Sequence, residues 1–407
     1  MRIDWKHWKK TILLLLSTSF GNIGNFIYLV AINLLVYQKT GSSTYVAMLW
    51  MISPAVNLLT KFWIGGLIDH KSQRKIMLIS LFARAFLIFL IPFLTELYLI
   101  FLILIFLSGF NSFFVPASAT YIAKFVPVPL RKRFNSIQSL SASGAFIVGP
   151  AIAGMLILWK DIEFTLMINA FLFVASALIL WFLPEVENQQ TAKKHSFTPS
   201  QIRRDWQTVL GFMKEQGYVT FIYSMYLAGT VFSFAMDAQE VVFAQGIVGL
   251  SEMEYSLLIS ITGIGSIVGA FLVTLFSQKI PLRMMISIGL LMEATGYLCY
   301  AFSWSFFSIA LGFTILGLFN AFTFTGITTF YQNNIPSSLF GRVTSIFQLY
   351  QSLMQISVVF IVGVIGDIIP LRMTIITLAL GMVLVSFLAI SKIIMPSKRK
   401  YFDEQQS

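Results

Sequence analysis

The chain has 407 residues, of which 57% are hydrophobic and only 11% are charged, and its net charge is +11. Soluble domains are about 45–50% apolar and about 25% charged, so this composition excludes an ordinary globular protein and requires a lipid environment. The single cysteine, Cys299, excludes a disulfide framework and a cysteine-ligated metal site. The basic residues gather in short polar connections, which favours a membrane protein over a nucleic-acid-binding protein.

Apolar runs of about 20 residues, the length needed to cross a hydrocarbon core, recur along nearly the whole chain. They predict an all-α membrane protein with twelve transmembrane helices. The first run is longer than the core of a signal peptide, so we expect no cleaved leader. The predicted spans are 11–37, 43–68, 76–94, 97–123, 136–159, 163–184, 217–245, 254–277, 284–302, 305–332, 343–366 and 371–395.

Lysine and arginine are distributed unevenly between alternate connections. One set of connections, which includes both chain ends, carries 23 of these residues, whereas the other set carries only Lys39, Lys160 and Arg372. Cytoplasmic connections are the ones enriched in lysine and arginine. We therefore expect a multi-pass protein of the cell membrane with both termini in the cytoplasm.

One long polar interruption, 185–216, divides the predicted spans into six plus six. It ends in a weakly amphipathic stretch from Gln201 to Met213, which indicates an interfacial helix. The predicted parts are an N-terminal six-helix bundle at 1–184, a cytoplasmic linker at 185–216, a C-terminal six-helix bundle at 217–396 and a cytoplasmic tail at 397–407.

The two halves of the chain resemble each other at an offset of 209 residues. At this offset 107–154 aligns with 316–363 without a gap, and fifteen of 48 positions are identical. Apolar composition alone does not explain the identities, because they include Asn111 with Asn320 and also proline and arginine pairs. The paired segments cross the membrane in the same direction, which is a parallel repeat of the kind found in rocking secondary transporters.

A seven-residue polar connection, 69–75, joins the second and third predicted spans and follows two glycines. It is similar to the signature loop of the major facilitator superfamily, G-x-L-a-D-r-x-G-r-k. The matching positions are filled by Gly65, Leu67, Asp69 and Arg74. His70 and Ser72 replace the usual arginine and second glycine. The chain resembles this superfamily over its whole length, which implies two pseudo-symmetric six-helix bundles.

The resemblance assigns Asp69 and Arg74 to a cytoplasmic gate that is separate from the substrate site. An acid at the membrane face can cap the N-terminus of a facing helix, and the predicted span that opens near Gly341 is the expected partner. A contact formed only when the inner gate is closed biases the equilibrium between two states. The alternative is that these charges are solvated and serve only the topology.

The fifth predicted span contains Gly149-Pro150 and, one turn later, Gly154. This sequence is similar to the glycine–proline motif of drug/proton antiporters, and 37–43 resembles the macrolide-efflux branch. The resemblance implies proton antiport of drug-like molecules. Packing is the alternative role, because proline interrupts helical hydrogen bonding and glycine permits close helix approach. The fourth span lacks the arginine of twelve-span drug antiporters and has Asn111 instead.

Ionisable residues inside the predicted spans are costly in lipid and are therefore candidates for function. Lys61 lies one turn from the cytoplasmic end of its span and can extend to the surface, which favours a structural role. Arg84 lies about 12 Å along the third span at about 1.5 Å per residue. It needs an internal partner or a wet cavity, and the sequence identifies neither.

Three acidic residues are candidates for proton coupling. Asp237 and Glu240 are three residues apart in the predicted seventh span, which places them on one side of its outer part. Their mutual repulsion favours proton uptake by one of them; the alternative is a hydrated, inert position at the outer interface. Glu293 lies near the middle of the ninth span. That span is peripheral in the family fold, so a structural hydrogen bond is the competing interpretation.

In the family fold the first, fourth, seventh and tenth spans line the central cavity. The candidate cavity residues are Asn22, Asn25, Tyr28, Asn111 and Asn320. Phe113, Phe114, Phe322 and Phe324 are expected to add an aromatic wall, although most phenylalanines must face lipid. A mainly apolar cavity with few acids suits amphipathic or cationic organic molecules, whereas anions need basic partners.

These observations predict a secondary active transporter that exports hydrophobic or drug-like small molecules in exchange for protons, by alternating access. We expect the proton gradient as energy source, no cofactor, no metal, no nucleic-acid partner, and a monomer surrounded by membrane lipids. The alternatives are an importer or facilitator of a specific metabolite and a non-transporting sensor. An enzyme is disfavoured because the spans contain no nucleophile–base pair, metal-ligand cluster or phosphate-binding loop.

Overall fold

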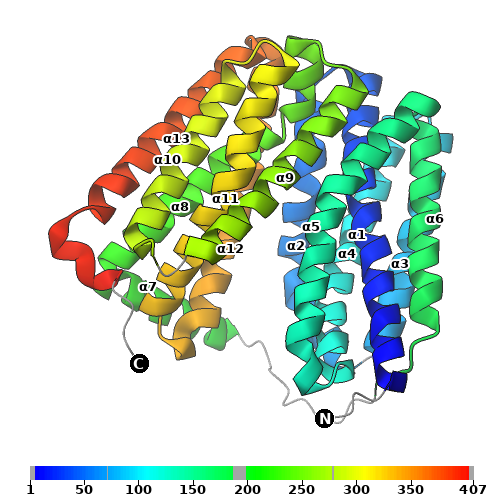
Figure 1. Ribbon diagram of the computed structural model, residues 1–407, viewed down its shortest axis with the longest axis horizontal. Helices are drawn as coiled ribbons and strands as arrows, with labels where there is room; N and C mark the ends of the chain where they lie inside the picture. The colour runs from blue at the N-terminus through cyan, green and yellow to red at the C-terminus, as the bar shows by residue number, and fades with distance from the viewer. Residues whose placement is uncertain (1–4, 71, 187–198, 277–278, 403–407) are drawn as a thin grey trace. The chain divides into compact units, whose positions relative to one another are not determined.

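A computed structural model describes residues 5–70, 72–186, 199–276 and 279–402, without the side chains of 5–9, 61–70, 128, 129, 132, 199–205, 337, 338 and 341. Within these ranges the chain is helical and contains no β-strand (Figure 1). The first half forms α1 (Trp5–Thr40), α2 (Ser43–His70), α3 (Gln73–Leu90), η1 (Ile91–Phe93), α4 (Leu97–Phe125), α5 (Val128–Trp159) and α6 (Ile162–Trp181). The second half forms α7 (Pro199–Glu215), α8 (Gly217–Asp237), η2 (Val242–Val248), α9 (Glu252–Phe276), α10 (Leu282–Ala301), α11 (Phe306–Asn334), α12 (Ser337–Ile368), α13 (Leu371–Ile393) and η3 (Pro396–Tyr401).

Eleven helices in the described part of the chain are long and apolar enough to cross a membrane. They are α1, α3–α6 and α8–α13, and α2 occupies the position of the remaining predicted span. In a hydrocarbon core every backbone N–H and C=O must be paired within the segment, and a long helix does this. The predicted all-α membrane architecture is confirmed.

Helix starts in the two halves are related by the same offset of 209 residues. It relates α2 to α9, α3 to α10, α4 to α11, α5 to α12 and α6 to α13. The ends of α4 and α5 also precede those of α11 and α12 by 209 residues. The correspondence seen in the sequence between 107–154 and 316–363 therefore extends over most of each half.

The chain separates into two compact units. The first contains 1–41, 49–193 and 251–260, and the second contains 42–48, 194–250 and 261–407. The first unit thus consists mainly of α1–α6 and the second mainly of α7–α13. The linker boundaries at 185–216 stay a prediction.

In the first unit, α1 packs against α5 and α6, and α3 packs against α4 and α6. Several polar side chains form hydrogen bonds in these contacts. Ser17 Oγ donates to the Ser176 carbonyl at 2.8 Å, and Ser176 Oγ donates to the Ser17 carbonyl at 2.8 Å. Asn169 Nδ2 donates to the Gly24 carbonyl at 2.5 Å. Such bonds hold transmembrane helices together because lipid provides little hydrophobic driving force for helix association.

In the second unit, α10 packs along α11, and α8 packs against α13. Glycines allow α9 and α11 to cross with their backbones in contact. A Cβ atom on Gly269 would lie 2.0 Å from the Leu318 carbonyl oxygen, and one on Gly317 would lie 2.1 Å from the Thr262 carbonyl oxygen. Only a residue without a side chain fits at either position.

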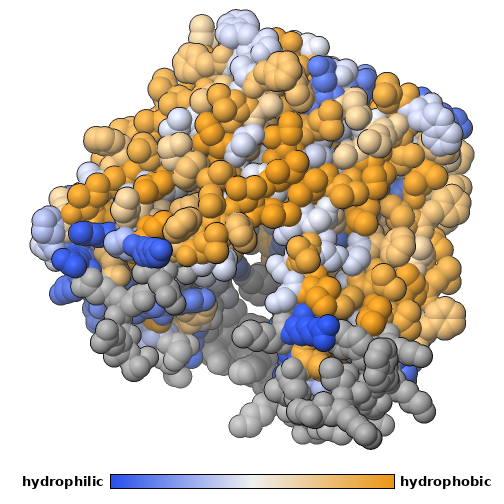
Figure 2. Space-filling view, viewed as in Figure 1, coloured by the Kyte–Doolittle hydropathy of each residue, from blue (hydrophilic) through white to orange (hydrophobic). Residues whose placement is uncertain are grey.

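On the face of the molecule seen in Figure 2, most described residues are hydrophobic, coloured orange. Large apolar side chains are exposed on several helices, among them Phe86 on α3, Leu158 on α5 and Phe307 on α11. A soluble protein rarely exposes a continuous apolar surface of this kind. The surface is the one expected of helices that are in contact with lipid.

Helix α7 covers the amphipathic stretch that the sequence predicts from Gln201 to Met213. Val209 and Phe212 on one face are buried in the hydrophobic core of the second unit, whereas Trp206 is half-exposed. The apolar face of this helix is therefore packed on protein, and its position at the membrane interface stays a prediction.

The seventh predicted span, 217–245, is wrong at its C-terminal end. Helix α8 ends at Asp237, a turn follows, and the π-helix η2 runs to the left-handed residue Gly249, whose φ is +80°. Asp237 and Glu240 therefore do not share one face of a continuous α-helix. The break falls at the polar stretch 237–240, but apolar residues flank it on both sides, so hydropathy averaged over a window joined the two sides into one predicted span.

The N-terminus of α6 provides a test of one local interaction. Asp161 is exposed, and its Oδ1 accepts a hydrogen bond from the Phe164 backbone N–H at 2.6 Å, which caps the helix. We expect Asp161→Ala to lower the free energy of unfolding by about 0.5–2 kcal/mol. Thermal unfolding of the purified full chain measures the loss. Asp161→Ser retains the cap and is the control; equal destabilisation by both substitutions would contradict the capping role.

Candidate functional site

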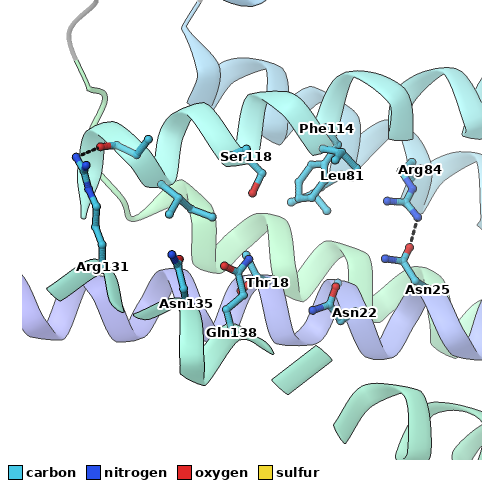
Figure 3. Close-up of a pocket in the computed structure, with 15 residues that line it drawn as sticks. Thr18, Asn22, Asn25, Leu81, Arg84, Phe114, Ser118, Arg131, Asn135 and Gln138 are labelled. Atoms are coloured by element: carbon cyan, nitrogen blue, oxygen red, sulfur yellow. Dashed lines mark hydrogen bonds between the residues drawn. The ribbon is translucent and has the colours of Figure 1, made fainter. Parts of the chain in front are cut away.

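A pocket of about 530 Å³ lies inside the first unit, among α1, α3, α4 and the first turns of α5 (Figure 3). Its volume is in the range of small-molecule sites. Its polar side chains are Thr18, Asn22, Asn25, Arg84, Ser118, Arg131, Asn135 and Gln138. Leu81, Phe114, Val115 and Ile122 contribute apolar surface. The described lining residues include two arginines and no acidic residue.

Arg84 is the most deeply placed charge of the pocket, with 5% of its surface exposed. Its Nη1 donates to Asn111 Oδ1 at 3.2 Å, and its Nη2 donates to Asn25 Oδ1. The guanidinium carbon lies 4.3 Å from the centre of the Phe173 ring. All of these partners are neutral, and no carboxylate in the described residues forms an ion pair with Arg84.

Helical spacing explains how these side chains come together. Asn22 and Asn25 are three residues apart on α1, and Leu81 and Arg84 are three residues apart on α3, so each pair presents one helix face. Figure 3 shows Asn22 and Asn25 on α1 opposite Phe114 of α4, with Arg84 beside Asn25 at one end of the pocket. A polar stripe on α1 thus forms one wall.

A second polar cluster lies in the second unit and is acidic. Asp237 Oδ1 accepts a hydrogen bond of 2.9 Å from the Tyr297 hydroxyl. Glu293 is 9% exposed, and its Oε1 accepts a hydrogen bond of 2.9 Å from Asn320 Nδ2. Glu240 Oε1 is buried and has no hydrogen-bond partner in the described part of the chain. No described lysine or arginine forms an ion pair with these three acids.

The two clusters occupy equivalent positions of the repeat. The offset of 209 residues that relates Asn111 to Asn320 also relates Arg84 to Glu293. In each unit the residue on the third span of its half bonds the asparagine on the next span, Arg84 to Asn111 and Glu293 to Asn320. The same framework therefore carries a cation in one unit and an acid in the other.

The five candidate cavity residues all belong to these two clusters. Asn22 and Asn25 line the pocket, Asn111 bonds Arg84, and Tyr28 lies close enough to Arg84 for an electrostatic interaction. Asn320 bonds Glu293. The sequence alone indicates neither the link between Arg84 and the asparagines nor the relation of Arg84 to Glu293, because the aligned segments, 107–154 and 316–363, include neither residue.

The expected aromatic wall is only partly present. Phe114 lines the pocket, whereas Phe322 is buried in the core of the second unit and Phe324 is 60% exposed. Two residues along an α-helix correspond to a rotation of about 200°, so Phe322 and Phe324 cannot face the same side. The sequence also predicts a cavity that suits amphipathic or cationic molecules. The lining of the pocket in the first unit disagrees with the cationic part of this prediction, because it contains two arginines.

The predicted gating residues Gly65, Leu67 and Asp69 lie where side chains are outside the described residues, and their role stays a prediction. Arg74 is described. Its guanidinium donates to the Trp181 carbonyl at the end of α6, and its Nη1 lies 3.9 Å from Glu185 Oε1. A cation near a helix C-terminus interacts favourably with the helix dipole. Arg74 therefore caps the C-terminus of α6.

The predicted packing motif lies in α5. A Cβ atom on Gly149 would lie 2.6 Å from Phe26 Cβ of α1, and one on Gly154 would lie 2.8 Å from Ser256 Cβ of α9. Pro150 lies within the same helix. Both glycines thus stand at close contacts, where larger residues would force neighbouring atoms apart.

The family model described as Major Facilitator Superfamily matches residues 14–358. The chain belongs to this superfamily and is a membrane transporter. It is also similar to the "Uncharacterized MFS-type transporter YfiS" of Bacillus subtilis (strain 168), with 29% identity over 181 residues. That match covers 44% of this chain and 43% of the relative, so it spans less than half of either protein.

Solved structures of several transporters share the fold. A nucleoside transporter, NupG, has a TM-score of 0.73 at 13% identity, covering 95% of this chain and 99% of its own. An inward-facing bacterial homologue of the human lysosomal transporter Spinster has a TM-score of 0.74 at 12% identity, covering 99% and 100%. A POT family transporter in complex with 5-aminolevulinic acid has a TM-score of 0.72 at 11% identity, covering 95% and 97%. At these identities the likeness concerns the fold alone.

Proposed function

We propose that this superfamily member is a proton-coupled exporter of amphipathic, drug-like small molecules that works by alternating access. The observation that carries the proposal is the acidic cluster in the second unit. Asp237 and Glu293 are held by a hydroxyl and an amide, respectively, with no described cation as an ion-pair partner. Intramembrane acids are costly and mark ion pathways.

Proton exchange at such acids provides a physical link to conformational change. A carboxylate that leaves water without a counter-ion is strongly disfavoured, whereas its neutral form is tolerated. The acids therefore lose their protons more readily when water reaches the cluster. Conversely, protonation of the acids favours a conformation in which water is excluded from the cluster. A bias of this kind moves an equilibrium between two states only when the states bind the proton with different affinity.

The repeat supports alternating access. Parallel repeats are the architecture of rocking transporters in which the two halves move as bodies, and the helix starts of the two halves correspond at 209 residues. Export is supported by the glycine–proline sequence in α5, which is similar to that of drug/proton antiporters. Asp69 and Arg74 remain the proposed elements of the inner gate.

Transport by inside-out membrane vesicles that contain the full chain tests the proposal. The probes are cationic ethidium, neutral Nile red and anionic fluorescein, and the gradient is imposed with the vesicle interior acidic. We expect at least one probe to accumulate inside and to be released by a protonophore. Accumulation that ignores the gradient would contradict proton coupling. Accumulation only under the reversed gradient would favour an importer on the same fold.

A further inference from the structure

Arg84 places a positive charge in the pocket of the first unit, and no described residue balances it with a negative charge in an ion pair. The side chain is 5% exposed, and its hydrogen-bond partners are the amide oxygens of Asn25 and Asn111. An arginine within a transmembrane segment is expensive and normally pairs with an acid or serves a pathway. The described residues of this unit offer Arg84 no acid.

The rest of the pocket also favours an oxyanion. Arg131 stands at the opposite end from Arg84 in Figure 3, and its Nε donates to the Val126 carbonyl at 3.1 Å. Between the two arginines, the amides of Asn22, Asn135 and Gln138 can donate to oxygen acceptors. The pocket therefore has a net positive lining and several neutral donors.

Comparison with the second unit shows that the fold does not require this charge. The repeat mate of Arg84 is Glu293, and both bond the equivalent asparagine, Asn111 or Asn320. The same pair of helices is thus built around an acid in one unit and around a cation in the other. The repeat framework therefore does not fix the sign of the charge at this position, and the cation calls for an explanation beyond that framework.

We propose that the pocket of the first unit binds the anionic group, a carboxylate or comparable oxyanion, of the transported molecule, with Arg84 as its receptor. A guanidinium matches such groups through paired, charge-assisted hydrogen bonds. The apolar remainder of the substrate packs against Leu81, Phe114 and Val115. The inference rests on the proposed transport function and narrows its substrate class to amphipathic organic acids and zwitterions.

A matched pair of fluorescent probes tests this inference. Dansylglycine carries a carboxylate, and dansylglycinamide has the same shape without the charge. Binding is measured by fluorescence anisotropy on the full chain in phosphatidylcholine nanodiscs. We expect the wild type to prefer dansylglycine by about tenfold or more, the size of a charge-assisted hydrogen bond. Arg84→Gln removes this preference, whereas Arg84→Lys keeps part of it.

Arg133→Gln is the matched control, because Arg133 is exposed and is not a lining residue. This variant is expected to keep the preference for dansylglycine. Retained binding of dansylglycinamide by Arg84→Gln, together with a single elution peak, shows that the variant is folded. A preference for dansylglycine that survives in Arg84→Gln, or no preference in the wild type, overturns the inference.

Two further comparisons distinguish this inference from binding of a lipid headgroup and from the proposal of proton coupling. Nanodiscs that contain phosphatidylglycerol test whether a lipid headgroup supplies the anion; displacement of dansylglycine by that lipid overturns the assignment to substrate. The binding assay uses no gradient, so a failure of proton coupling in vesicles leaves its outcome intact. Conversely, gradient-driven transport of probes with no carboxylate preference overturns the inference and leaves the proposed function standing.

Discussion

Glu293→Gln is expected to reduce gradient-driven probe accumulation to the level of protein-free vesicles. Glutamine has the shape of protonated glutamate and still accepts the hydrogen bond from Asn320 Nδ2, which in the native protein is 2.9 Å long. It cannot bind or release a proton, so the driving force no longer reaches the transport cycle. The measurement is probe accumulation in vesicles with an imposed gradient, compared at equal protein abundance.

Asp237→Asn is expected to have the same effect, because Asp237 is the other acid of the cluster with a neutral hydrogen-bond partner, the Tyr297 hydroxyl. Exchange of probe across the membrane without a gradient should persist in both variants, since alternating access itself stays possible. Glu96→Gln is the matched control, because Glu96 is exposed and makes no side-chain cap bond. If both variants accumulated the probe as the wild type does, the acids would have structural roles and would not couple transport to protons.

Gly317→Val is expected to have the largest effect on stability. A Cβ atom at this position would lie 2.1 Å from the Thr262 carbonyl oxygen, and backbone atoms cannot move aside as a side chain can. Overpacking of a well-packed core costs about 1–3 kcal/mol and occasionally more, and a backbone contact belongs at the upper end. We expect a marked loss of folded protein, measured by size-exclusion elution and thermal unfolding in detergent.

Gly269→Val tests the same crossing from α9, where a Cβ atom would lie 2.0 Å from the Leu318 carbonyl oxygen. The matched control is Gly109→Val in the middle of α4, where a Cβ atom meets nothing within 4 Å. The control is expected to unfold close to the wild-type temperature. If all three substitutions had the same effect, the loss would reflect glycine replacement in general and not the contact of α9 with α11.

The positions of the membrane helices could be predicted closely because apolar length is a strong signal in lipid. The fourth predicted span, 97–123, corresponds to α4, Leu97–Phe125. The prediction failed at the end of α8, where the chain changes from an α-helix to a turn and a π-helix within one predicted span. Hydropathy measures transfer to lipid and does not register which hydrogen-bond pattern the backbone adopts.

The sequence identified several residues of the candidate site but did not predict which of them contact one another. The sequence indicated Asn111 and Asn320 as repeat mates, and both lie at the clusters. It did not connect Arg84 with Glu293, because a comparison based on identity cannot detect a position at which the charge has been reversed. The partner of Arg84 depends on the packing of α3 against α4 and of α1 beside them, which no local spacing specifies.

The most direct test follows proton movement and substrate movement together. Proteoliposomes loaded with dansylglycine and an internal pH dye are diluted into probe-free buffer without an imposed pH gradient. We predict that outflow of the probe from the wild type drives protons inward and acidifies the interior, whereas Glu293→Gln releases the probe with no change in internal pH. Release of dansylglycine by the wild type at constant internal pH would contradict proton-coupled export.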